Sequence, residues 1–128
     1  MTTIPLRIAF HGTEPSPAIE ERVRAELDEL AEIHRITSAQ VTMQAPGKHH
    51  HKGGTWSVRI VLHVPGSDIA ASRDHGHDHS HEDPYVALRD AFAAVARMLD
   101  DHARRVRGEV KAHELTARER AALSGGES

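Results

Sequence analysis

The sequence predicts an α+β fold, a two-layer sandwich in which two roughly parallel helices pack on one face of a four-stranded, mostly antiparallel sheet. Three observations support this. Two segments have apolar residues every three or four positions, and each begins with a capping residue followed by proline. The other patterned segments alternate apolar and polar residues, as half-buried strands do. The patterns follow one another in the order β-α-β-β-β-α.

The first strand and helix are predicted close to the start of the chain. Alternation marks the strand at Ile4, Leu6, Ile8 and Phe10. Ser16 is a suitable N-cap and Pro17 suits the first helical position, so a helix is expected to begin there. Its apolar face consists of Ile19, Val23, Leu27, Leu30 and Ile33. We expect this helix to end near His34.

Three further strands are predicted between the helices. Alternation resumes at Ile36 and stops before Pro46 and Gly47. The clearest strand of the chain follows at Trp56, Val58, Ile60, Leu62 and Val64. These two strands are expected to pair as a hairpin around a long basic loop. After a turn at Pro65-Gly66, residues 68–72 form a weaker fourth strand.

The second helix is predicted to begin at Asp83, its cap, and Pro84. Its apolar stripe consists of Leu88, Phe92, Val95, Leu99 and Val106. Gly108 is expected to end it, which divides the chain into an α+β domain at residues 1–108 and a polar tail at 109–128. A capping-box pattern at Thr116–Glu119 predicts a short helix in the tail, and residues 124–128 are expected to be disordered.

The composition excludes several classes of protein. The 128 residues include no cysteine, which rules out disulfides, thiolate metal sites and a cysteine nucleophile. No apolar run approaches the roughly 20 residues of a membrane span, and the N-terminus does not resemble a signal peptide, so a cytoplasmic protein is expected. The four aromatic residues are expected in the core, which leaves none to stack bases. No catalytic motif is present, so no enzymatic activity is expected.

Basic residues form the first candidate site. On the second predicted helix they lie opposite the apolar stripe and at its flanks: Arg89, Arg97, Arg104, Arg105, Arg107 and Lys111. Such a surface can contact a phosphate backbone, although interruption by Asp90, Asp100 and Asp101 also fits an ordinary solvated face. The hairpin loop adds a basic run that can reach a nucleic-acid groove or remain a solvated loop: Lys48, His49, His50, His51 and Lys52.

Histidine is the second notable feature, with twelve residues in a chain of formal net charge −3. Near pH 6 about three quarters of ordinary imidazoles are protonated, which would make the protein basic. Between residues 75 and 81 a histidine occupies every second position, beside several carboxylates. His77, His79 and His81 could therefore hold a divalent metal such as zinc or nickel. Adventitious metal binding and a pH-dependent anion contact are the alternatives.

Several stretches resemble the ribosome hibernation-promoting factors, also called ribosome-associated translation inhibitors or sigma-factor modulation proteins. The element order over residues 4–107 is similar, as is the opening HGTEPSPAIEERV. The family's tyrosine-containing helix pattern appears at Tyr85–Asp90. The segments QAPGKHHHKGG and HSHEDPYVALRDAF resemble a histidine-bearing branch of that family.

The resemblance implies a non-enzymatic, cytoplasmic factor of stressed or stationary-phase bacteria that requires no cofactor. Such a factor binds the small ribosomal subunit and its 16S rRNA and occludes the mRNA and tRNA sites. The six basic residues of the second helix match the positions of the family's rRNA contacts. Because that helix is less basic than in typical members, we hypothesise that the histidine loops add charge, with tighter binding at pH 6 than at pH 7.5. A histidine-rich metal-binding protein and a general double-stranded RNA-binding module are the alternative functions.

Overall fold

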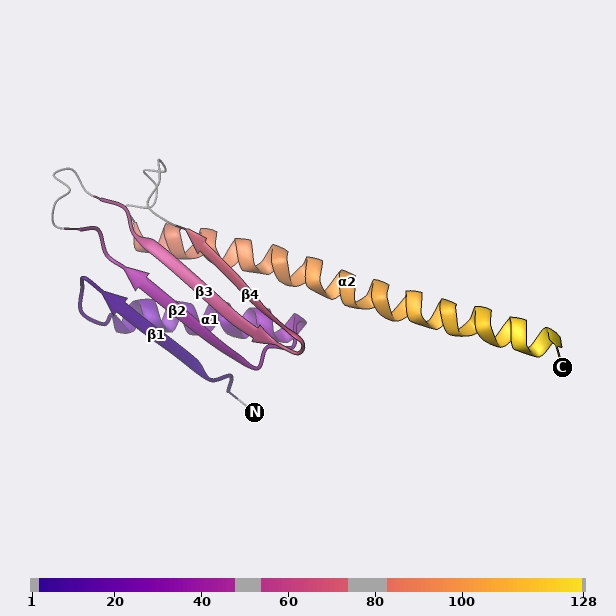
Figure 1. Cartoon of the computed structure of the whole chain (residues 1–128). Coiled ribbons are helices and arrows are strands. Elements are labelled where there is room, and N and C mark those ends of the chain that lie inside the picture. The colour runs from indigo at the N-terminus through magenta and orange to yellow at the C-terminus, as the bar shows by residue number, and fades with distance from the viewer. Residues whose placement is uncertain (1–2, 48–53, 74–82, 128) are drawn as a thin grey trace. The chain divides into compact units, whose positions relative to one another are not determined.

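The computed structural model describes residues 3–47, 54–73 and 83–127. Its elements occur in the predicted order (Figure 1): β1 (Leu6–His11), α1 (Pro17–Ile33), β2 (Ser38–Gln44), β3 (Ser57–Val64), β4 (Ser67–Arg73) and α2 (Pro84–Glu127). The chain forms two compact units, Met1–Met98 and Leu99–Ser128. The first unit therefore contains the whole sheet, α1 and the start of α2. No helix in the described part of the chain is long and apolar enough to cross a membrane.

The sheet has the strand order β1-β2-β3-β4. β1 and β2 are parallel, with Ile8 opposite Val41, because α1 carries the chain back to the same end of the sheet. The other two pairs are antiparallel, and they place Val41 opposite Ile60 and Ile60 opposite Ala71. The predicted, mostly antiparallel sheet and its hairpin are thus confirmed.

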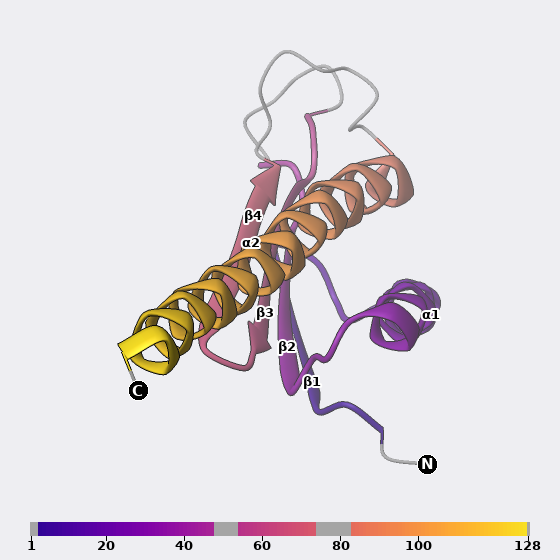
Figure 2. The ribbon, with the colours of Figure 1, turned by 90° about the vertical axis from the view of Figure 1, so that its right-hand side faces the viewer.

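One face of the sheet carries the core. Buried residues alternate along β2 and β3, so Val41, Ile60 and their neighbours of the same parity form an apolar layer. In the first unit, α1 and the start of α2 cover this layer and run in roughly the same direction (Figures 1 and 2). They bury against it a set of apolar side chains: Ile19, Val23, Leu27, Leu88, Phe92 and Val95. The predicted two-layer sandwich is confirmed.

Both predicted helix starts are confirmed by their hydrogen bonds. The Ser16 hydroxyl accepts a bond of 3.2 Å from the Ile19 N–H, and Pro17 is the first residue of α1. The Asp83 carboxylate accepts a bond of 2.8 Å from the Tyr85 N–H at the start of α2. α1 ends at its C-cap His34, as expected.

Several side chains expected in the core are not fully buried. Ile33, the last residue of α1, is 77% exposed because the helix ends there. Val106 is 44% exposed, and none of the side chains described at residues 100–108 is buried. Of the four aromatic residues, Phe92 is buried, Phe10 and Trp56 are half-buried, and Tyr85 is 38% exposed. Tyr85 lies three residues before Leu88, at the margin of the apolar stripe, which leaves part of its ring in solvent.

The predicted end of α2 is wrong. The helix continues through Gly108 to Glu127, so the separate short helix and the disorder predicted for residues 124–127 are wrong as well. Among the described residues only Gly12 and Gly66 have positive φ, which means that Gly108 does not adopt the left-handed conformation that terminates helices. A glycine in a helix costs only about 1 kcal/mol relative to alanine, and helix-forming neighbours can offset this. The division of the chain into an α+β domain at residues 1–108 and a polar tail at 109–128 stays a prediction.

Gly108→Ala is expected to stabilise α2 by about 0.5–1 kcal/mol, because alanine loses less conformational entropy in a helix. Nothing within 4 Å obstructs a Cβ at this position. Hydrogen exchange of the neighbouring amides measures the change directly. Faster exchange in the variant would contradict the helical conformation at residue 108.

Candidate nucleic-acid interface

The first unit presents two of the predicted basic residues of α2. Arg89 and Arg97 are both exposed. The Arg89 guanidinium lies 3.2 Å from the Asp90 carboxylate. Arg97 has no hydrogen-bond or ion-pair partner within the described part of the chain. Its charge is therefore not neutralised by a neighbour and can act on a bound anion.

The second unit holds the remaining basic candidates of α2. Arg104, Arg105 and Arg107 are exposed, whereas only the backbone is described at Lys111. Arg104 pairs with Asp101 one turn earlier at 2.7 Å. Exposed pairs of this kind contribute only about 0–1 kcal/mol, so a phosphate can displace the carboxylate at little cost.

Two predicted sites fall outside the described residues. They are the hairpin-loop residues Lys48, His49, His50, His51 and Lys52, and the metal-ligand candidates His77, His79 and His81. Strand register places described residues that flank the two segments side by side: Gln44 pairs with Ser57, and the next residue, Val58, pairs with Arg73. Where the structure describes side chains, residues 3–47, 54–72 and 83–108, no cluster of three potential metal ligands occurs. The metal site stays a prediction.

Two arginines that the sequence analysis did not single out lie on the face of the sheet opposite the helices. Arg7 is opposite Gln40, and Arg59 is opposite Thr42 and Ser72. Both arginines are exposed. In the sequence they appear as polar positions of alternating strands. Strand parity alone assigns each to the solvent side, but the register is needed to bring them onto one surface.

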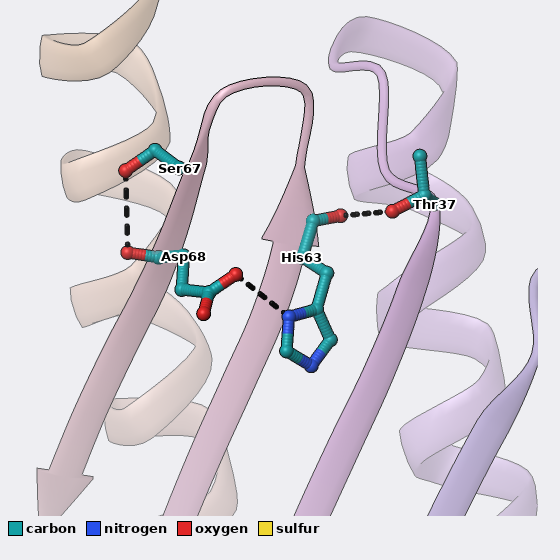
Figure 3. A network of polar contacts seen from close by, with 4 residues as sticks. All are labelled: Thr37, His63, Ser67 and Asp68. Atoms are coloured by element: carbon teal, nitrogen blue, oxygen red, sulfur yellow. Dashed lines mark hydrogen bonds and ion pairs between the residues drawn. The ribbon is translucent and has the colours of Figure 1, made fainter.

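The same face carries a small polar network at the β3–β4 turn (Figure 3). His63 Nδ1 and Asp68 Oδ1 are 2.7 Å apart. The backbone carbonyl of His63 accepts bonds from the Thr37 N–H at 2.8 Å and from its hydroxyl at 2.9 Å. Asp68 is the sole acidic residue on this face among the described strand residues, and His63 already engages it.

α1 has the opposite electrostatic character. Its sequence PAIEERVRAELDELAEI contains six acidic and two basic side chains. Both basic side chains are engaged: Arg22 pairs with Glu26 at 3.0 Å, and Arg24 donates to the Ile4 carbonyl at 2.7 Å. The solvent-facing side of α1 therefore repels a phosphate backbone.

Comparison of the sequence with known protein families shows to which family the chain belongs. Residues 6–107 match the family described as sigma 54 modulation protein / S30EA ribosomal protein. The chain belongs to this family. Its members are ribosome-associated factors without enzymatic activity, so the resemblance and the prediction of a non-enzymatic protein are confirmed.

Two solved structures show the same fold. A ribosomal subunit interface protein from Coxiella burnetii is 17% identical, with a TM-score of 0.57 over 78% of this chain and 98% of that one. The N-terminal domain of Protein Y from Thermus thermophilus is 18% identical, with a TM-score of 0.58 over 79% of this chain and 99% of that domain. At these identities the likeness concerns the fold alone. No curated protein matches the sequence significantly.

Proposed function

We propose that this S30EA-family protein binds the small ribosomal subunit through 16S rRNA and occludes the mRNA and tRNA sites in the cytoplasm of stressed or stationary-phase cells. The family match carries the proposal, because residues 6–107 span all four strands, α1 and α2 as far as Arg107. The name of the Coxiella burnetii structure, a subunit interface protein, supports the same location on the ribosome.

The charge distribution supports an RNA partner. Arg97 is exposed and unpaired among the described residues, and the ion pairs of Arg89 and Arg104 are at the surface, where phosphates can replace the carboxylates. Because α1 is acidic, it is expected to face away from the rRNA. The net charge of −3 is thus compatible with RNA binding through one part of the surface.

Co-sedimentation with purified 30S and 70S ribosomes through sucrose tests the proposal. The wild-type protein is expected to pellet stoichiometrically, and an excess of unrelated RNA duplex is expected not to displace it. Displacement by any duplex would favour the general double-stranded RNA-binding function. Absence of pelleting at every salt concentration and pH would contradict the proposal. Runs at pH 6 and pH 7.5 with matched salt test the hypothesis on the histidine loops.

Arg97→Glu is expected to weaken ribosome binding by about tenfold or more, because it removes a phosphate contact and introduces repulsion. Arg35→Glu provides the matched control, since Arg35 is exposed, undergoes the same change of charge and lies outside α2. The control is expected to bind nearly as the wild type does. Equal losses in the two variants would show that net charge, rather than α2, governs binding.

A further inference from the structure

We infer that the open face of the sheet, the side opposite α1 and the start of α2, contacts rRNA phosphates through Arg7 and Arg59. This inference rests on the proposed function and adds a second RNA-contacting surface to it. On each strand, the residues that alternate with the core-facing ones form the open face. It was not among the sites predicted from the sequence.

The geometry places the two arginines within reach of one RNA segment. Arg7 belongs to β1 and Arg59 to β3, two strands away. On β2, which lies between them, Arg7 is opposite Gln40 and Arg59 is opposite Thr42, two residues further along. With strand spacings near 4.8 Å, the two Cα atoms are about 12 Å apart. Two extended guanidinium groups can therefore contact neighbouring or facing phosphates at the same time.

The surface around the arginines is suited to close approach by a backbone. The neighbouring positions of the open face are small or uncharged: Ala9, Gln40, Thr42, Val61, Ala70 and Ser72. No long acidic side chain stands among them. Gln40 is exposed and can donate a hydrogen bond to a phosphate or ribose oxygen. The wide, shallow minor groove of an RNA helix presents phosphates and hydroxyls to a face of this kind.

The charge of the open face favours an anionic partner such as a phosphate backbone. Arg7 and Arg59 have no ion-pair partner within the described residues, whereas Arg89 and Arg104 of α2 have one each. Asp68, next to the β3–β4 turn, is opposite His63, which lies four residues after Arg59 on β3. Its carboxylate already contacts the His63 ring (Figure 3). Among the strand residues that the structure describes, no large apolar side chain is exposed on this face. Unneutralised arginines on a flat polar surface fit a phosphate backbone.

The test is the double variant Arg7→Gln with Arg59→Gln in the full chain. Glutamine keeps a polar side chain at both positions, and thermal unfolding verifies that the fold is retained. Because the two sites are well separated, losses of about tenfold each should combine to about a hundredfold weaker ribosome co-sedimentation. The slope of log affinity against log salt should fall in magnitude by about two.

The matched control is Arg22→Gln with Arg35→Gln, which removes the same charge from exposed positions away from the open face. Near wild-type binding is expected for it. Equal weakening in both double variants would overturn the inference, because net charge alone would explain the result. Unchanged ribosome binding of the Arg7→Gln, Arg59→Gln double variant would also overturn it. Aggregation of that variant would then indicate that Arg7 only protects the edge strand β1.

Binding to purified 16S rRNA separates this inference from the proposed function. If wild-type protein fails to pellet with ribosomes, the proposed function is wrong. In that case a selective loss of rRNA binding in the open-face variant still supports the inference. Equal rRNA binding by wild type, control and open-face variant would refute it.

Discussion

Replacing Ile60 with alanine is expected to lower the free energy of unfolding by about 2–5 kcal/mol. Ile60 is fully buried in β3, an inner strand, between Val41 of β2 and Ala71 of β4. The substitution removes apolar contacts and leaves a cavity that the sheet and helices fill only in part. Since domains of this size are typically stable by about 5–15 kcal/mol, the loss would be a large fraction of the total. Urea unfolding with linear extrapolation measures it.

Val61→Ala on the same strand is the control. Val61 is half-buried on the open face, so its loss should cost no more than about 1 kcal/mol. The comparison tests the register itself, because a slip of one residue would exchange the two faces of β3. A larger cost at Val61 than at Ile60 would show that the assigned register is wrong.

Raising monovalent salt from about 50 to about 200 mM is expected to weaken ribosome binding by about a thousandfold. The expectation follows from the six basic residues of α2 proposed to contact phosphates: Arg89, Arg97, Arg104, Arg105, Arg107 and Lys111. If each neutralises one phosphate, counterion release gives a slope of log affinity against log salt near −5. Co-sedimentation or fluorescence titration across the salt range measures that slope.

Magnesium is held constant in this series so that the ribosome stays intact. A slope near −1 would contradict the proposed phosphate contacts of α2, because one neutralised phosphate would account for it. A slope steeper than −5 agrees with additional contacts, such as those inferred for the open face.

The local signals in the sequence identified every element of the sheet layer and both helix starts. Ser16 and Asp83 each act within three residues along the chain, so their capping roles are visible in the sequence itself. The alternation in β3 likewise depends only on which positions face the core. Gly108 shows the limit of such rules, because whether a glycine ends a helix depends on its φ and not on its identity.

For the candidate site, the sequence determined which residues carry charge, including the basic positions of α2, and its motifs indicated the family. Only the tertiary structure decided that β1 pairs in parallel with β2, and hence that Arg7 and Arg59 share the open face. It also decided that Arg89 and Arg104 are paired with Asp90 and Asp101 while Arg97 has no partner among the described residues. Composition and periodicity are properties of a segment, whereas strand register and ion pairing depend on which atoms folding brings together.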